Sequence, residues 1–151
     1  HVTCAIIEQD GCVLAAQRSR TMAMPLKWEF PGGKIKPGEI PEHCLCREIA
    51  EELAIKVAVD HALAEVIHAY PDFTITLYPF VCSIISGTII LREHAAVTWL
   101  SREELASLDW AEADRPVLET YLQFAGRDIP WLPGPVPVSI IQKHFKNWIG
   151  S

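Results

Sequence analysis

The sequence predicts an α+β fold in one main domain, and three features of the chain support this expectation. Short β-rich segments alternate with turn residues along much of the chain. One segment near the middle has the hydrophobic periodicity of an amphipathic helix. The chain has 151 residues, half of them hydrophobic, which is enough for a compact domain with a substantial core. We place this domain at residues 1–126 and interpret residues 127–151 as a C-terminal extension.

The N-terminal part of the chain predicts a β-hairpin followed by a loop. Residues 2–8 are rich in β-forming side chains, Gln9-Asp10-Gly11 is typical of a tight turn, and residues 12–18 form the returning strand. Residues 21–27 then form a loop, which we interpret as a cover over a binding site.

A helix is predicted from Pro41 to about Leu53. Proline suits the first helical position, where its missing N–H has no partner to lose. Leu45, Ile49 and Leu53 recur every four residues and form a stripe that should be buried. Ile40 offers no capping oxygen at the start of this helix, and that absence costs about 1 kcal/mol.

Three carboxylates gather on one flank of this helix. Glu48, Glu51 and Glu52 are three or four residues apart, so they are neighbours beside the apolar stripe. Like charges at this spacing repel by about 0.2–0.5 kcal/mol a pair, and a divalent cation would remove the repulsion. Mg²⁺ prefers such oxygens together with water and phosphate. Taken alone, these glutamates fit a solvated helix surface, partly paired with Arg47, better than a metal site.

The second half of the chain predicts further strands and three helical segments. Strands are expected at residues 56–59, 62–70, 73–84, 88–91 and 95–100. Ser101 and Glu104 form a capping box that opens a short helix, and Asp114 is expected to cap a helix that runs to about Phe124. Residues 139–149 are amphipathic, and they either pack on the domain or contact another subunit.

Charge, hydrophobic runs and cysteine content limit the possible partners and location of the protein. A net charge of −6 disfavours binding to nucleic-acid polymers. No apolar run approaches the roughly 20 residues of a membrane span, and no signal peptide is visible. The five cysteines are odd in number and lack zinc-binding spacing, so we interpret them as reduced, buried thiols of a cytoplasmic protein.

One stretch, residues 28–55, carries a specific resemblance. Gly33 is followed after five residues by Glu39, and seven further residues lead to Arg47-Glu48-Ile49-Ala50-Glu51-Glu52. This spacing closely resembles the Nudix box. The preceding segment, Trp-Glu-Phe-Pro-Gly-Gly-Lys, is similar to the MutT branch of the Nudix family, and the resemblance extends to about Phe124.

Ala54 departs from the box, which has glycine at this place. Alanine disfavours the left-handed conformation that commonly ends a helix, so we expect the exit from the helix to be tighter here. The departure removes no side-chain ligand.

The resemblance implies a fold and a reaction. The fold is the Nudix-type α/β/α sandwich, with a mixed β-sheet between helices. The reaction is metal-dependent hydrolysis of a nucleoside triphosphate to a monophosphate and pyrophosphate. The implied ligands of Mg²⁺ or Mn²⁺ are Glu48, Glu51 and Glu52, with the backbone carbonyl of Gly32 or Gly33 as a further ligand.

The resemblance also suggests roles for other charged residues. Glu93 is a candidate for an extra metal carboxylate, although an exposed surface role fits it nearly as well. Glu48 is the simplest general base, acting directly or through a water. Arg47 is expected to hold a glutamate in place, and Arg18 and Lys34 are candidates for binding the phosphate chain.

Phe30, Tyr70 and Asp114 are the candidates for contacts with the rest of the substrate. The Tyr70 ring also fits ordinary strand packing. In MutT-like enzymes the residue at the place of Asp114 reads the base, and the oxidised-guanine specialist has asparagine there. An ionised carboxylate only accepts hydrogen bonds, so we expect a broader specificity that includes cytidine-type triphosphates.

Three functions follow from these observations. The first is a pyrophosphohydrolase that sanitises the nucleotide pool, in the service of DNA repair, on 8-oxo-dGTP-like or CTP/dCTP-type substrates. The second is a Nudix hydrolase of ADP-ribose, dinucleoside polyphosphates or sugar nucleotides, and the third is a non-catalytic module that binds a nucleotide. The complete glutamate set argues against the third, and residues 28–34 favour the first. The expected partner is a small-molecule nucleotide, with no membrane or nucleic-acid polymer, in a monomer or homodimer.

Overall fold

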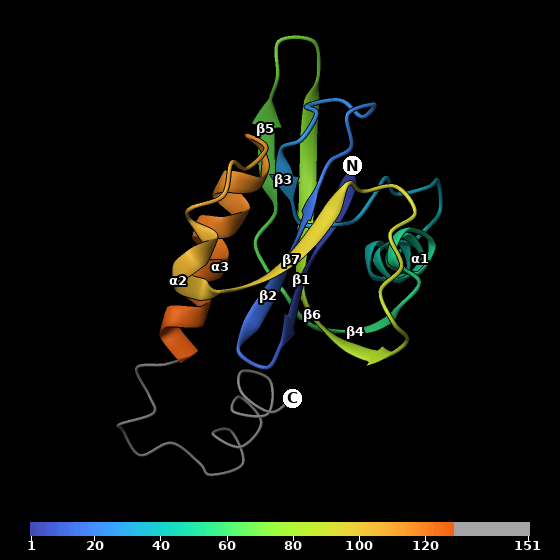
Figure 1. Cartoon of the computed structure of the whole chain (residues 1–151). Coiled ribbons are helices and arrows are strands. Elements are labelled where there is room, and N and C mark those ends of the chain that lie inside the picture. Colours follow the sequence, from blue (N-terminus) through green and yellow to red (C-terminus); the bar gives the residue numbers. More distant parts are fainter. Residues whose placement is uncertain (129–151) are drawn as a thin grey trace.

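A mixed β-sheet forms the middle layer of the structure (Figure 1). The computed structural model describes residues 1–128. Its strands are β1 (Val2–Gln9), β2 (Cys12–Gln17), β3 (Trp28–Glu29), β4 (Lys56–Ala62), β5 (Val66–Ala69), β6 (Thr74–Ser86) and β7 (Ala96–Ser101). The order is β3-β2-β1-β6-β4, with β5 also paired to β6 and β7 also paired to β2. Strands β1 and β6 are parallel, and the other named pairs are antiparallel.

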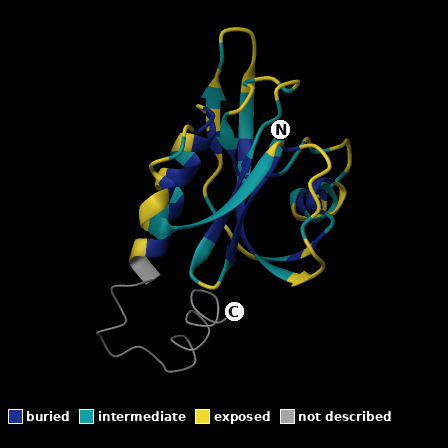
Figure 2. Cartoon of the chain, in the orientation of Figure 1, coloured by how far each residue is buried: buried dark blue, intermediate teal, exposed yellow. Residues whose placement is uncertain are grey.

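Helices cover both faces of this sheet. Helix α1 (Pro41–Leu53) lies on one face, and α2 (Arg102–Leu105) and α3 (Asp114–Asp128) lie on the other (Figure 1). Strand β1 shows why: Ala5 and Ile7 pack in the core under α1, whereas Cys4 and Ile6 pack in the core under α2 and α3. The central strands are accordingly buried (Figure 2). The expected α/β/α sandwich with a mixed sheet is confirmed.

Helix α1 has the predicted bounds and the predicted buried stripe. Leu45, Ile49 and Leu53 are fully buried, and Ile40 makes no side-chain capping bond. The expectation about Ala54 is wrong, because alanine adopts the left-handed conformation that it should avoid, with φ 61°. The buried Ile55 that follows and the Ala54 N–H, which donates to the carbonyl of Ala50, hold it there.

The predicted strand at residues 88–91 does not form. The backbone N–H of Ile90 donates to the carbonyl of Leu53, and that of Arg92 donates to the carbonyl of Glu52. These amides therefore satisfy the last carbonyls of α1 instead of pairing within the sheet. Strand β6 ends at Ser86, and the connection to β7 crosses the end of α1.

Strands β1 and β2 separate beyond their hairpin, and this separation places the site. They pair only at Glu8–Val13 and Gln9–Cys12 among the described residues. The segment after β3 fills the gap: the N–H of Ala5 donates to the carbonyl of Pro31, and the N–H of Thr3 donates to that of Gly33. The turn before α1 thus lies against the central strand of the sheet.

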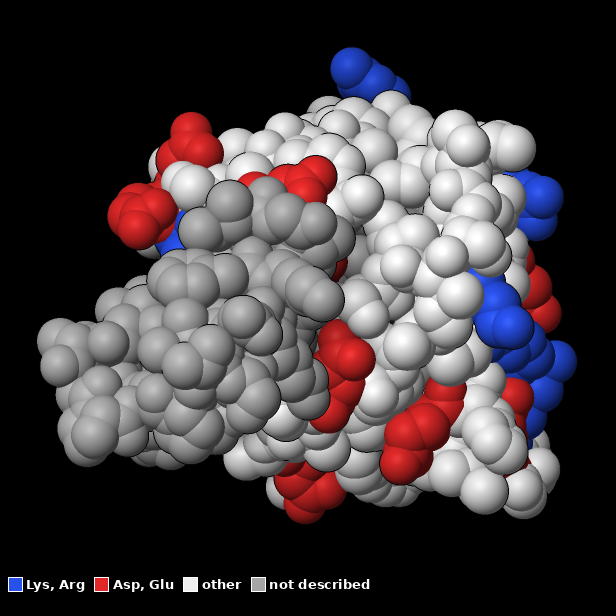
Figure 3. All heavy atoms as spheres, turned by 90° about the horizontal axis from the view of Figure 1, so that it is seen from below, with Lys and Arg blue, Asp and Glu red and all other residues white. Residues whose placement is uncertain are grey.

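Other predictions concern the surface and the C-terminus. All five cysteines are free thiols, and Cys4, Cys44 and Cys82 are buried. No helix within residues 1–128 has the length and apolar character needed to cross a membrane. One face carries acidic and basic side chains side by side (Figure 3). The amphipathic segment predicted at residues 139–149 lies outside the described residues, as does most of the predicted extension.

Candidate active site

Gly32 and Gly33 allow α1 to approach the sheet where no side chain would fit. A Cβ atom on Gly32 would lie 2.0 Å from the carbonyl oxygen of Thr3, and one on Gly33 would lie 2.2 Å from Cδ of Glu48. The glycines therefore bring the Glu48 carboxylate directly against the backbone of the turn. The Gly33 carbonyl accepts hydrogen bonds from the N–H and hydroxyl of Thr3, so its oxygen is directed at β1.

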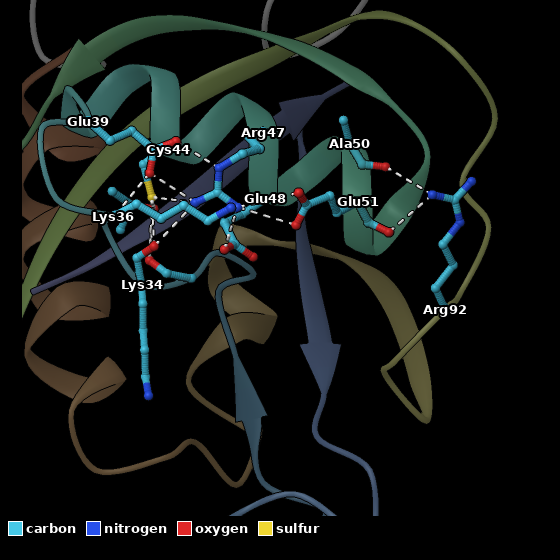
Figure 4. A network of polar contacts seen from close by, with 11 residues as sticks. Lys34, Lys36, Glu39, Cys44, Arg47, Glu48, Ala50, Glu51 and Arg92 are labelled. Carbon is cyan, nitrogen blue, oxygen red and sulfur yellow. Dashed lines mark hydrogen bonds and ion pairs between the residues drawn. The ribbon is translucent and has the colours of Figure 1, made fainter.

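Arg47 is the centre of the outer part of the site, on the solvent side of α1 (Figure 4). Its Nε and Nη2 donate to the two Glu39 carboxylate oxygens at 2.7 and 2.9 Å. Its Nη1 donates to Glu48 at 2.9 Å and to Glu51 at 3.3 Å. The bonds from Arg47 lower the pKa of Glu39 to about 2. We call these four side chains the outer network.

Glu52 lies one helical turn beyond Glu48 on α1. It is 6% exposed, and its Oε2 has no hydrogen-bond partner among residues 1–128. Burial is the main cause that raises the pKa of Glu52 to about 9, and the negative charges of Glu29, Glu93 and Glu48 add to it. The chain alone therefore supplies too little positive charge for this carboxylate.

Sequence reasoning missed Glu29, which lies beside Glu52. Arg18 Nη1 contacts one oxygen of the Glu29 carboxylate, and His94 Nε2 lies 2.8 Å from the other. His94 is buried, with its side chain 1% exposed. A signal was available in the sequence, because a glutamate inside the short segment between Trp28 and Phe30 must find partners when it is buried.

The connection between β6 and β7 brings Glu93 to the same region. Glu93 is exposed, and its charge contributes to the raised pKa of Glu52. The neighbouring Arg92 anchors this connection, because its Nη1 donates to the carbonyls of Ala50 and Glu51 at 3.4 and 3.2 Å (Figure 4). The last turn of α1 and Glu93 are thus held together.

Asp114 lies on the opposite side of Glu29 from α1, and two expectations about it are wrong. It is the first residue of α3 rather than the residue before the helix, and its Oδ2 accepts a hydrogen bond from the Phe30 N–H at 2.9 Å. Burial, with the charge of Glu29, raises the pKa of Asp114 to about 8. The side chain is therefore mostly protonated at neutral pH, whereas an exposed aspartate would be ionised. Glu52, Glu29 and Asp114 are the inner carboxylates of this site.

The two aromatic candidates lie near Asp114 but in different environments. Phe30 is 2% exposed and packs on Trp110 with ring centroids 4.6 Å apart, so its side chain belongs to the core. Tyr70 is half-buried, and its hydroxyl accepts a hydrogen bond from the Ala113 N–H at 3.1 Å. Tyr70 and Trp110 line a cavity of about 400 Å³ that also borders Arg115.

The two candidates for phosphate binding also differ. Arg18 is held in the site by Glu29 and by the carbonyl of Ala23, to which its Nε donates. Lys34 is exposed, and its side chain extends away from the outer network (Figure 4). The structure therefore brings Arg18 to the inner carboxylates and leaves Lys34 at the edge.

The residues present fit a hard divalent cation. They offer carboxylate oxygens, one of which, Glu52 Oε2, is buried and unpartnered. Within residues 1–128 no three acidic, histidine or cysteine side chains already converge as a cage. This arrangement suits Mg²⁺, which is usually held by one or two carboxylates together with water and substrate phosphate.

Comparison with known proteins agrees with this geometry. A family model described as NUDIX domain matches residues 2–120. The chain is 37% identical over 122 residues to the CTP pyrophosphohydrolase of Escherichia coli (strain K12), covering 81% of this chain and 90% of that protein. It is 31% identical over 113 residues to the 8-oxo-dGTP diphosphatase of the same organism, covering 75% of this chain and 88% of that protein.

A solved structure agrees as well. The solution structure of the E. coli ORF135 protein matches with a TM-score of 0.72 at 33% identity, covering 90% of this chain and 93% of that one. The box of spaced glutamates, the sandwich fold and these relatives lead to one conclusion. The chain belongs to the Nudix family of hydrolases.

Proposed function

We propose that this Nudix hydrolase cleaves nucleoside triphosphates to a monophosphate and pyrophosphate with the help of Mg²⁺ or Mn²⁺, and that its substrates are CTP/dCTP-type and 8-oxo-dGTP-type nucleotides. The observation that carries the proposal is the unpartnered Glu52 oxygen, which lies among other carboxylates where a cation would relieve its burial. Nudix hydrolases generally use a divalent metal. The two E. coli relatives act, by name, on CTP and on 8-oxo-dGTP, and a role in cleaning the nucleotide pool follows from such substrates.

The cation would be held by Glu48, Glu51 and Glu52, with Glu93 as a further carboxylate. When bound, it supplies positive charge to the phosphates and makes a water easier to deprotonate. Of the two backbone carbonyls predicted as ligands, Gly32 is the better candidate, because the Gly33 carbonyl is already engaged by Thr3.

Glu48 would act as the general base. Arg47 Nη1 holds its Oε1, while its Oε2 lies against the glycine turn, so the carboxylate has a fixed orientation. A carboxylate held in a fixed orientation is what general-base catalysis requires. Arg47 then serves as a support for Glu48 rather than as a phosphate ligand.

The base would be read near Asp114 and Tyr70: Tyr70 lines the cavity, and Asp114 immediately precedes Arg115, which also lines it. A protonated Asp114 both donates and accepts hydrogen bonds, as asparagine does. Both cytosine and oxidised guanine present edges that such a group can satisfy. The expected preference for cytidine nucleotides depended on an ionised aspartate, so a protonated Asp114 removes the reason for it. A protonated Asp114 instead supports activity on both substrate classes.

A panel of nucleotides tests the proposed function. Purified protein is incubated with CTP, dCTP, 8-oxo-dGTP, ADP-ribose and a dinucleoside polyphosphate, with Mg²⁺, with Mn²⁺ or with chelator. We expect pyrophosphate release from the triphosphates, no turnover in chelator and recovery when metal is returned. Full turnover in excess chelator would exclude the metal mechanism, and a preference for ADP-ribose or dinucleoside polyphosphate would overturn the substrate assignment.

The variant Asp114→Asn tests how the base is read. At a pH well below 8, the ratio of kcat/KM for CTP to that for 8-oxo-dGTP should change little, because both side chains then donate and accept. Above that pH the wild-type aspartate ionises, and the two proteins should differ by about 1–3 kcal/mol in this ratio, the scale of one buried polar mismatch. A ratio that is the same in both proteins at every pH would place base recognition elsewhere.

A further inference from the structure

Two buried carboxylates in the described part of the chain are each held by an arginine and an aromatic donor. Glu8 on β1 is bound by Arg102 Nη2 at 3.2 Å and by the Tyr121 hydroxyl. Glu29 on β3 is bound by Arg18 Nη1 and by His94 Nε2. The two clamps use the same chemistry, but only Glu29 has the carboxyl groups of Glu52 and Asp114 as neighbours.

The histidine of the Glu29 clamp is poorly suited to a packing role. Its side chain is 1% exposed, and its Nδ1 has no hydrogen-bond partner among the described residues. A buried nitrogen without a partner costs free energy, which an apolar side chain of similar size would avoid. The bond from Nε2 to Glu29 is therefore the feature that distinguishes histidine from an apolar residue here.

The clamp fixes both oxygens of Glu29 from adjoining elements. Arg18 follows β2, and His94 precedes β7, which pairs with β2 along its length. The N–H of Ala95 also donates to the carbonyl of Gln17, so the two ends are joined by backbone. Glu29 itself pairs with Ala16 of β2, and its carboxylate has little freedom to turn.

We propose that His94 is a positioning residue whose Nε2–H holds the carboxylate of Glu29 beside Glu52, so that Glu29 faces the cation without becoming a ligand. The proposal rests on the proposed function, because it assumes a cation at Glu52. Loss of the Nε2 donor releases one oxygen of Glu29 within the group of inner carboxylates, and the arrangement that receives the cation is disturbed. Second-layer groups of this kind typically change metal affinity or activity by about 10–100-fold.

Binding of Mn²⁺ without nucleotide tests the proposal apart from catalysis. The dissociation constant is measured for the wild type and for His94→Leu, His94→Asn and His94→Gln. The glutamine amide reaches the place of Nε2, whereas the shorter asparagine reaches only that of Nδ1. We expect Leu and Asn to raise the Kd by about tenfold or more and Gln to restore it. If the leucine variant fails to fold, the Asn and Gln pair gives the same comparison.

The matched control is Tyr121→Phe, which removes the aromatic donor from the other clamp. It should lower the thermal stability while leaving Mn²⁺ affinity and turnover as in the wild type. A double-mutant cycle completes the test: on a Glu29→Gln background, His94→Leu should have no further effect on Kd or kcat, because it acts through Glu29.

Three outcomes would overturn the proposal. The first is that His94→Leu and His94→Asn lower the melting temperature but leave the Mn²⁺ affinity unchanged. The second is that the effects of the two substitutions in the double-mutant cycle are additive. The third is that the wild type binds no Mn²⁺. Failure of the proposed function looks different, because it appears in the wild type as absent triphosphate hydrolysis while the Mn²⁺ affinities still report on His94.

Discussion

Glu39 and Glu52 belong to the same sequence motif, yet their carboxylates lie in opposite electrostatic environments. Glu39 shares both oxygens with Arg47, which lowers the pKa of Glu39 to about 2. Glu52 is buried against other carboxylates, which raises the pKa of Glu52 to about 9. The same motif thus contains one carboxylate whose charged form is stabilised and one whose charged form is not.

We therefore expect the environment of Glu39 to contribute mainly to stability and that of Glu52 mainly to catalysis. In the outer network Arg47 pairs with three glutamates near solvent, where water screens the two negative charges that one guanidinium leaves uncompensated. Glu52 and Asp114 are buried where their charged forms are not compensated, so burial favours the neutral forms in the metal-free fold, and a bound cation would favour the ionised form of Glu52. Sites that break the ordinary rules of burial are where function is expected.

The largest expected effect comes from the inner side. Glu52→Gln should lower kcat by about 10²–10⁴, the range for loss of an acid–base or electrostatic group. Glu51→Gln is expected to fall in the same range if Glu51, which is 57% exposed, leaves Arg47 to bind the cation. Steady-state kinetics with saturating Mg²⁺ measures both.

The fold should survive Glu52→Gln, because a neutral amide of similar size replaces a buried carboxyl group whose charged form has too few partners. Its unfolding free energy in chelator should equal or exceed that of the wild type. Glu103→Gln, an exposed glutamate on α2, is the control and should match the wild type in both measurements. A Glu51 or Glu52 variant with wild-type kcat would assign that residue to the helix surface alone.

Arg47→Lys is the next effect in size, and it breaks the outer network. Lysine cannot bind both Glu39 oxygens and also reach Glu48, because it lacks the forked guanidinium. Glu48 then loses its support, and kcat should fall by about 10–100-fold. Kinetics beside the exposed control Arg20→Lys checks this, and an unchanged kcat would show that Glu48 is held by the glycine turn alone.

The sequence was sufficient to predict the regular parts of this molecule. Spacing of apolar residues predicted α1 and its buried stripe, and alternation predicted most strands, because both follow from local geometry. The failures all depend on tertiary contacts. Residues 88–91 bond to the end of α1 instead of forming a strand, and Ala54 accepts a left-handed backbone.

The site divides in the same way. The outer network could be predicted because its members lie within one motif, at spacings that one helix and its preceding loop fix. The inner side could be predicted only in part: Glu52 lies in the motif and Asp114 follows from the resemblance, whereas Glu29 and His94 come from distant elements that meet only in the folded chain. The pKa of Asp114 was misjudged for the same reason, because burial is a property of the whole fold.

The dependence of unfolding on acid pH tests the contribution of Glu39 to stability. Its pKa is lowered in the folded state from 4.5 to about 2, so the stabilisation by Arg47 is complete above the unfolded value. It is lost progressively as the pH falls from that value through the folded one. Glu39→Gln should therefore be less stable than the wild type near neutral pH, and the gap should close in acid.

Urea unfolding of both proteins across this pH range measures the gap. Glu103→Gln again serves as the control and should show no gap that depends on the Arg47 contact. A gap between wild type and Glu39→Gln that stays constant down to the folded pKa would mean that the outer network adds little to stability.

The smallest effect concerns Ala54, the residue at which α1 ends. Its φ of 61° lies in the region where an L-residue with a Cβ is strained by about 1–2 kcal/mol. Glycine relieves this strain but makes the unfolded chain more flexible, which costs about 0.4–1 kcal/mol. Ala54→Gly should therefore raise the unfolding free energy by about 0.5–1 kcal/mol, the difference between these effects.

Ala106, at the end of α2, is the matched control, because its φ of −64° is right-handed and Ala106→Gly should lower stability. Because Ala54 contributes no side-chain ligand, kcat should stay at the wild-type value. A loss of stability in Ala54→Gly would show that the Ala54 methyl group, rather than the backbone bonds to the end of α1, holds the exit of the helix.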